Sequence, residues 1–506
     1  MPMKLGLSLL VFCLVILPSS YANKRVDIAA PTPANYLKKP TGQYRVGFKD
    51  FRWVNQAVCP DPNFNGKNQD DFSLGNTRHC HEIIARIYYP SMKNNQQCSP
   101  YYEPFIRQQL QMLKQDKNIS AEQLEQFNQI KSYSIKDASI ISNQKFPVLI
   151  FIPGLGNPAE NYENFITELV SHGYIVIGLN SPFINLVSLS NGHIVELPLQ
   201  SGGEAGIEKN IIPLQKKDVL FIYKYIHNAS DSNPIFTSMD LSHVGVFGHS
   251  VGARIAADMA HDYANWFQAG ATLDIGFDTT GASRKKFIIP FMHEICANRT
   301  LASNGIPVTF ELGKKGYLVV VSPNADDYTY SYHGNFTDAS TLQYIAAFHT
   351  FLSDDAQHNI EPKFDIKIIS HALSDGEIQR FTKLVYVLMK IDGRWYGAVY
   401  QNKNKITDFN VDKVANLRIA LDVLPHESIK HLSEIEMEPI KIAIAKLHSI
   451  LSRPLGTGDG WEITDHINVY LEKFFDMYLK SESNQRLEKC IPLTNNSFID
   501  CGPGVF

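Results

Sequence analysis

From residue 146 onward, short runs of apolar residues alternate with segments of helical periodicity. Residues 146–154 form a continuous apolar run, which is typical of a strand buried on both faces of a sheet. Strands that alternate with helices predict the α/β class, with a mostly parallel sheet covered by helices on both faces. We expect strands at 81–90, 146–154, 174–180, 243–248, 270–276, 286–297 and 326–332, and helices at 162–172, 216–226, 251–261 and 463–480.

The rest of the chain is less regular. Residues 23–75 are rich in Pro, Asn and Gly and are expected to be mostly irregular. Residues 384–400 predict a β-hairpin around Asp392 and Gly393, and helices are expected in 101–130 and 439–451. The predicted organisation is a signal peptide at 1–22, a core at 23–354 with a helical insert near 101–130, an insertion and possible cap at 355–455, and a final core helix with a tail at 456–506.

The N-terminus has the features of a secretory signal. Lys4 precedes an apolar stretch at 5–17 that is too short to span a membrane stably, and Pro18 ends it. We expect cleavage after residue 22 and secretion, with an uncleaved anchor as the alternative. No later run is apolar and long enough to cross a bilayer.

The expected mature chain contains six cysteines, an even number that favours disulfides in an oxidising compartment. Cys490 with Cys501 is the favoured pair, and Cys59 with Cys80 is the second choice. The run 78–82, Arg-His-Cys-His-Glu, could suggest a metal site, but adjacent ligands rarely all point one way. We therefore prefer a disulfide cysteine beside a strand and predict no metal site. The six cysteines are Cys59, Cys80, Cys98, Cys296, Cys490 and Cys501.

The charge balance gives no indication of nucleic-acid binding. The net charge is −4 over 506 residues, and no basic stripe indicates nucleic-acid binding. Peripheral contact with lipid surfaces stays open, because 101–130 has apolar positions at helical spacing, which more often indicate core packing.

Ser250 lies in the pattern Gly-x-Ser-x-Gly, between Gly248 and Gly252. The pattern alone is weak, but an apolar strand precedes it and an amphipathic helix follows it. A nucleophile elbow needs this context, because its sharp turn leaves almost no room for flanking side chains. The sequence therefore predicts that Ser250 is a nucleophile.

A nucleophilic serine needs a base and an acid that orients the base, in the chain order Ser, Asp or Glu, His. Asp274 lies in a short apolar run, where an acid is costly without a partner. Asp278 is its competitor. His333 directly follows the strand expected at 326–332 and is the favoured base, with His371 as its rival.

Two backbone amides are expected to bind the oxyanion. One belongs to the residue after the nucleophile, Val251, and the other to the turn after an earlier strand. Residues 153–157, Pro-Gly-Leu-Gly-Asn, form such a turn after the strand at 146–154. We choose Leu155 as the second donor, and the alternative is a turn that merely needs glycine.

Several segments together resemble the secreted platelet-activating-factor acetylhydrolases, lipoprotein-associated phospholipase A2 and their bacterial relatives, in the α/β-hydrolase superfamily. They keep the family's order over roughly residues 80 to 340. Carried over position by position, the resemblance implies Ser250, Asp274 and His333 as the triad, and Leu155 and Val251 as oxyanion donors. The segments are ARIYYPS (85–91), FPVLIFIPGLG (146–156), ELVSHGYIVIGLN (168–180), GHSVGA (248–253), ATLDIG (271–276) and HGNFTD (333–338).

The chain also departs from this family. Pro153 stands where relatives usually carry histidine, and Ala253 replaces a second glycine after the elbow. In the family the final helix follows the catalytic histidine more closely, whereas about a hundred residues intervene here. That insertion could roof the acyl pocket, which leaves the substrate preference open.

The sequence thus predicts a secreted serine esterase that needs no metal or organic cofactor. The resemblance implies a substrate that is a phospholipid with a short or oxidised acyl chain, or a similar short-chain ester. A broader lipase or polyesterase is the alternative enzyme. A binding protein on a hydrolase scaffold whose chemistry has lapsed is the alternative from another class.

Overall fold

The fold is described by a computed structural model. It describes residues 36–55, 81–92, 97–101, 125, 129–182, 184–185, 187–189, 194–195, 207–228, 233–274, 288–295, 317–321, 333–342, 365–368, 384–391, 394–401, 459–480 and 498–501.

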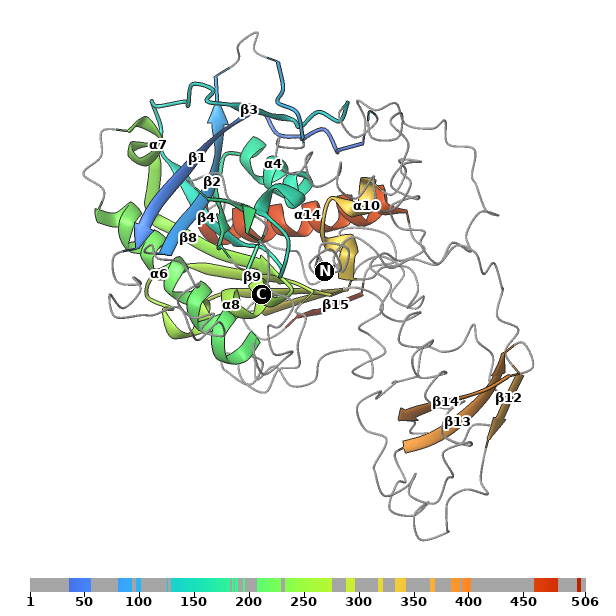
Figure 1. Cartoon of the computed structure of the whole chain (residues 1–506). Coiled ribbons are helices and arrows are strands. Elements are labelled where there is room, and N and C mark those ends of the chain that lie inside the picture. Colours follow the sequence, from blue (N-terminus) through green and yellow to red (C-terminus); the bar gives the residue numbers. More distant parts are fainter. Residues whose placement is uncertain are drawn as a thin grey trace, which may run out of the picture.

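A ten-stranded sheet forms the centre of the described structure (Figure 1). Its middle strands are parallel, with β4 (Phe146–Ile152) between β5 (Ile175–Asn180) and β8 (Met239–His249). The order is β15-β11-β10-β9-β8-β4-β5-β2-β1-β3, and β1, β2 and β15 bring in the antiparallel pairings. The other strands are β1 (Arg45–Asn55), β2 (His81–Ser91), β3 (Ser134–Lys136), β9 (Ala269–Leu273), β10 (Phe291–Ile295), β11 (Tyr317–Val321) and β15 (Phe498–Cys501).

Helices cover both faces of this sheet. Figure 1 shows α4 beside α14, and α6 near α8. The long helices are α4 (Glu163–Ser171), α6 (Ile212–Asn228), α8 (Val251–Asp262) and α14 (Gly460–Leu479). Shorter turns are η2 (Ala159–Tyr162), η3 (Ile207–Ile211), α7 (Pro234–Thr237), η6 (His333–Phe336) and α10 (Ala339–Leu342).

The core explains why β4 is apolar at every position. Val148 and Ile150 belong to the hydrophobic cluster that includes residues of α6 and α8. Leu149 and Phe151 belong to the opposite cluster, which includes residues of α4 and α14. Because side chains alternate across a strand, a sheet with two covered faces needs apolar residues throughout. The predicted α/β-hydrolase class is confirmed.

Most predicted elements of the core are present with small changes of bounds, but the expectation for 23–75 is wrong within the described residues. Residues 45–55 form β1, which pairs antiparallel with β2 along its whole length. Val46 and Phe48 belong to one hydrophobic cluster, whereas Phe51 and Trp53 pack against the other. Residues two apart thus share a face, as they do in a strand.

One strand of the sheet before His333 was not predicted from the sequence. β11 (Tyr317–Val321) pairs in parallel with β10 and was not predicted, whereas the strand expected at 326–332 lies outside the described residues. β15 then closes this edge by pairing antiparallel with β11. The strand expected at 326–332 therefore stays a prediction.

The predicted hairpin at 384–400 is confirmed as β13 (Leu384–Ile391) and β14 (Arg394–Gln401), joined across Asp392 and Gly393. With β12 (Asp365–Ile368) it forms a separate three-stranded sheet.

The signal peptide, the helix at 439–451 and most of 101–130 lie outside the described residues, as do Cys59, Cys80, Cys296 and Cys490. Among the described cysteines Cys98 is free.

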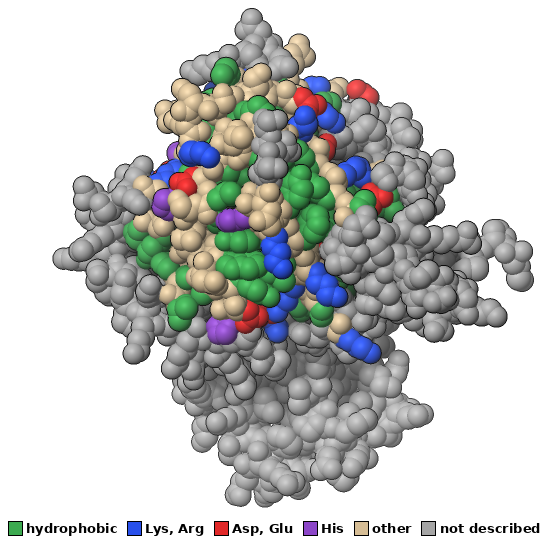
Figure 2. Space-filling model, turned by 90° about the vertical axis from the view of Figure 1, so that its left-hand side faces the viewer, with side chains coloured by type: hydrophobic (Ala, Val, Ile, Leu, Met, Phe, Trp, Pro, Cys, Tyr) green, Lys and Arg blue, Asp and Glu red, His purple; other side chains and the backbone are tan. Residues whose placement is uncertain are grey.

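Within the described ranges, every helix falls short of the combination of length and apolar character that a bilayer crossing requires. Figure 2 shows one face of the molecule, on which hydrophobic side chains reach the surface between lysine and arginine side chains. Scattered apolar area is common on folded proteins, so this face alone indicates no particular partner.

Candidate active site

Ser250 occupies a sharp turn between β8 and α8. Its backbone has φ 58° and ψ −121°, a strained conformation for a residue that bears a Cβ. A Cβ on Gly252 would lie 2.1 Å from the carbonyl oxygen of Ile152, and one on Gly248 would lie 2.4 Å from the carbonyl oxygen of Gly252. Close backbone approach therefore requires glycine on both sides of Ser250, as a nucleophile elbow does.

Asp274 directly follows β9, the strand next to β8. The amide of Ser250 donates to the carbonyl of Leu273 at 3.1 Å, and the amide of Asp274 donates to the carbonyl of Glu294 at 2.7 Å. Asp274 also has a positive φ, 42°, and is fully buried. The ends of three neighbouring strands thus place an acid beside the elbow, at the edge where parallel sheets bind ligands.

His333 begins η6 and is paired with this acid. Its Nδ1 hydrogen-bonds Oδ2 of Asp274, and its ring lies 4.4 Å from the ring of His249, the residue before Ser250. The Asp274 side chain has no exposed surface, whereas 38% of the His333 side chain is exposed. An ionised carboxylate only accepts, so Nδ1 carries the proton and Nε2 is left as the basic nitrogen.

The turn after β4 is held by bonds from the segment after β5. The side-chain amide of Asn185 donates to the carbonyl of Gly154 at 3.1 Å and to that of Asn157 at 2.7 Å. The amide of Gly156, whose φ is 77°, donates to the carbonyl of Ile184 at 2.8 Å. Both ends of the turn are therefore fixed by the segment after β5.

This turn packs directly on the elbow. A Cβ on Gly154 would lie 3.2 Å from Cβ of Ser250, so Leu155 follows the point of contact. Val251 is the first residue of α8, and amides of a first helical turn have no acceptor within the helix. The two predicted oxyanion donors thus belong to segments that meet at Ser250.

The loop that carries His333 is anchored through Asp338. Its carboxylate accepts the amides of Glu163 at 2.8 Å and Asn164 at 2.9 Å, at the start of α4, and the hydroxyl of Tyr101 at 2.8 Å. Burial raises the pKa of Asp338 to about 7, against the lowering effect of these hydrogen bonds. The last residue of the His-x-Asn-Phe-x-Asp motif therefore fixes the loop to α4.

The structure brings Asp274 and His333 together, whereas the competitors Asp278 and His371 lie outside the described residues. The roles of the five predicted site residues stay predictions.

Sequence reasoning missed residues that contact the predicted site. One signal was available, because a histidine directly before the serine follows the apolar run at 244–248. The missed residues are Tyr162, Asn185, His249 and Asp338.

His81, from the run considered as a metal site, has a structural partner. Its Nε2 lies 2.9 Å and 3.1 Å from the two carboxylate oxygens of Asp218, and both side chains are buried. The hydroxyl of Ser181 donates to the same carboxylate at 2.7 Å. This ring nitrogen therefore serves to join β2 to α6.

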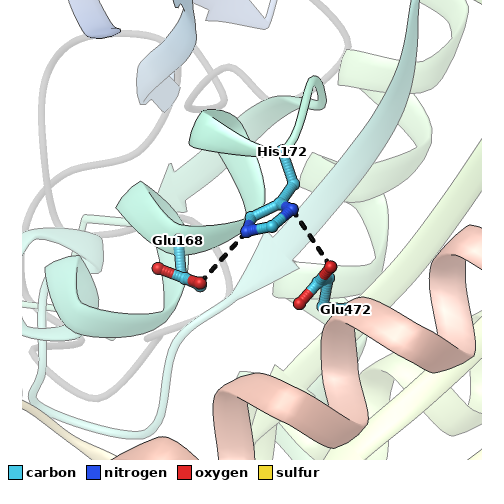
Figure 3. Close-up of side chains that lie close together, drawn as sticks. All are labelled: Glu168, His172 and Glu472. Carbon is cyan, nitrogen blue, oxygen red and sulfur yellow. Dashed lines mark hydrogen bonds and ion pairs between the residues drawn. The ribbon is translucent and has the colours of Figure 1, made fainter. Parts of the chain in front are cut away.

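A second group of ligand-type side chains joins α4 to α14. Figure 3 shows the ring of His172 between the carboxylates of Glu168 and Glu472, at 3.2 Å and 3.0 Å. Hydrogen bonds that the ring donates to these two carboxylates raise the pKa of His172 to about 9, although burial opposes the shift. The ring therefore carries both protons at neutral pH and can donate to both carboxylates.

His172→Gln should reduce stability most below about pH 6.5 and least above pH 9. The folded-state pKa lies above the ordinary value of 6.5, so the stabilisation is complete at low pH and is lost as the pH rises through about 9. The shift corresponds to a loss on the order of 3 kcal/mol at pH 6. Urea unfolding at pH 6, 8 and 10 measures this.

Glu472→Gln is the matched variant for that prediction. It removes one carboxylate and leaves Glu168, so we expect the same trend with pH and a smaller loss. An equal loss for His172→Gln at pH 6 and pH 10 would show that the charge of the ring contributes nothing.

Comparisons with known proteins match part of the chain to one family and its fold to a solved structure. Residues 30–181 match the family described as platelet-activating factor acetylhydrolase, isoform II. A ferulic acid esterase from Streptomyces cinnamoneus has a similar structure, with a TM-score of 0.53 at 14% identity, covering 92% of this chain and 98% of the esterase. No curated protein matches the chain. Together these findings support a hydrolase of carboxylic esters. The resemblance to the platelet-activating factor acetylhydrolases is thus confirmed over residues 30–181, on an α/β-hydrolase fold.

Proposed function

We propose that this chain is a secreted serine esterase that forms an acyl-enzyme on Ser250. The observation that carries the proposal is the pairing of buried Asp274 with half-exposed His333 beside the elbow. A serine hydroxyl attacks an ester only when a base removes its proton, and the base works only in the correct tautomer. The Asp274 carboxylate favours that tautomer.

In the proposed reaction, Nε2 of His333 removes the proton of Ser250 as Oγ attacks the ester carbonyl. The amides of Leu155 and Val251 stabilise the oxyanion of the tetrahedral intermediate. His333 then gives its proton to the departing alcohol. Water attacks the acyl-enzyme, with His333 again as base, and the acid leaves.

The substrate that we propose is a phospholipid with a short or oxidised acyl chain. The family match over 30–181 supports it, since it covers the turn after β4 and the strands β4 and β5. A broader esterase is the second candidate. The fold favours it, because the protein of similar structure is a ferulic acid esterase.

The test compares esters with the purified mature chain. We expect hydrolysis of p-nitrophenyl acetate and butyrate and little hydrolysis of p-nitrophenyl palmitate. We also expect release of acetate from a 1-alkyl-2-acetyl-glycerophosphocholine. A fluorophosphonate should add once, and mass spectrometry should find it on the peptide that contains Ser250. Preference for palmitate or methyl ferulate would favour the broader esterase. A folded chain that neither hydrolyses any ester nor reacts with the probe would favour a binding protein that has lost its catalytic activity.

Secretion is part of the proposal and rests on the apolar stretch at 5–17 that follows Lys4. Expression in a host with a secretory pathway should yield a mature chain that begins near residue 23. An intact N-terminus in the cell membrane fraction would support the anchor instead.

A further inference from the structure

His249 is the buried polar residue closest in sequence to Ser250, and the proposed reaction does not use it. It is the last residue of β8 and only 2% exposed. Its ring lies on the ring of His333, at 4.4 Å between centroids, and nearly parallel to the ring of Phe336, at 6.2 Å. It therefore fills the space between the elbow and the loop that carries the predicted base.

The hydrogen bonds of His249 have defined directions. Its Nε2 lies 3.1 Å from the backbone carbonyl of His333, which can only accept, so Nε2 carries a proton. Its Nδ1 lies 2.9 Å from the hydroxyl of Tyr162, and the amide of Gly154 donates to that hydroxyl at 3.0 Å. The neutral Nε2–H tautomer satisfies all of these contacts, because Tyr162 accepts from Gly154 and donates to Nδ1.

This chain of bonds connects three segments that are far apart in the sequence. Gly154 belongs to the predicted oxyanion turn, His249 to the elbow and His333 to the loop of the base. The packing leaves little freedom, since a Cβ on Gly154 would lie 2.9 Å from Nδ1 of His249 and 3.1 Å from the hydroxyl oxygen of Tyr162. A shift of any one segment would therefore move the others or break a bond.

We infer that His249 and Tyr162 are positioning residues that hold the predicted oxyanion turn and the loop of His333 in register with Ser250. The inference rests on the proposed function, since it concerns that same site. Acyl transfer needs the oxyanion donors and the base to be placed together around one carbonyl. A misplacement of about 1 Å can lower the rate about a hundredfold.

A purely structural role would have other consequences. A buried histidine and a buried tyrosine could satisfy each other as ordinary parts of the core, and their loss would then lower stability alone. Here the named bonds end on the backbone of the turn and of the base's loop. Their loss should therefore lower kcat in the fraction of protein that stays folded.

The test uses Tyr162→Phe, which removes one hydroxyl, His249→Phe, which keeps a ring against Phe336, and the double variant. We expect kcat on p-nitrophenyl butyrate to fall about 10- to 100-fold in each single variant, with KM within about twofold. The rate of fluorophosphonate labelling should fall in parallel. The double variant should be no slower than the slower single variant, because both changes break the same chain of bonds. His249→Gln, whose amide can still donate and accept, should recover part of the loss.

Tyr174→Phe is the matched control. Tyr174 is also fully buried, and its hydroxyl donates to Asp476 on α14 at 2.7 Å, away from the site. We expect a change in melting temperature without a change in kcat. The inference is overturned if Tyr162→Phe and His249→Phe behave like this control. If the wild-type chain itself neither hydrolyses esters nor labels, the proposed function fails and the inference with it, and the wild type alone reveals that case.

Discussion

Ser250→Ala should lower kcat for p-nitrophenyl butyrate about a million-fold and abolish labelling by the fluorophosphonate. Alanine keeps the Cβ, so the strained backbone at φ 58° experiences the same steric conditions, and only Oγ is lost. The fold should therefore persist, and circular dichroism and the melting temperature check this. Residual hydrolysis would come from binding and from the oxyanion donors.

His333→Ala belongs to the same experiment, because a nucleophile and its base act as one unit. We expect a loss similar to that of Ser250→Ala, and no further loss in the double variant. Ser242→Ala, a change in the same strand, is the control and should hydrolyse at the wild-type rate. Activity of more than about one hundredth in Ser250→Ala would show that another group is the nucleophile.

The elements that could be predicted are those whose local sequence directly reflects their burial or their backbone geometry. β4 is apolar at every position, and β5 is apolar up to Leu179, because helices cover both faces of the sheet. Their sequences therefore indicate their burial directly. β8, Ser250 and α8 could be predicted because the sharp turn requires glycine at two fixed positions. β1 was missed because one of its faces is partly exposed and Lys49, Asp50 and Arg52 interrupt its apolar residues.

The strands at the far edge of the sheet illustrate a different limit. β11 and β15 are short, and β15 lies next to β11 only because segments about 180 residues apart pair antiparallel. Such a pairing depends on the whole fold and has no local signal. The strand expected at 326–332 lies outside the described residues and stays a prediction.

In the predicted site, too, residues with a local sequence pattern could be predicted, and residues placed by long-range contacts could not. Ser250, Asp274 and His333 could be chosen from chain order and local context, because each element that carries them has its own pattern. The residues that orient them could not. Tyr162 looks like any aromatic residue at a helix start, yet its hydroxyl joins Gly154 to His249, which lies 87 residues after Tyr162. Such contacts follow from the way separate segments meet, which one sequence does not reveal.

Asp274→Asn should lower kcat about ten-thousand-fold while the chain stays folded. The carboxylate of Asp274 accepts from Nδ1 of His333, which leaves Nε2 free to remove a proton. An asparagine amide can instead donate to Nδ1, and the proton then sits on Nε2, where it blocks the base. The backbone should tolerate the change, because asparagine adopts a positive φ as readily as aspartate does.

Asp278→Asn is the control, because Asp278 is the competing acid in the sequence and receives the same substitution. We expect wild-type kcat from it, and KM near the wild-type value in both variants. A large loss in Asp278→Asn with little loss in Asp274→Asn would reverse the assignment of the acid. A loss in neither would mean that His333 works without an orienting carboxylate, and the pairing of Asp274 with His333 would then have to be explained by stability alone.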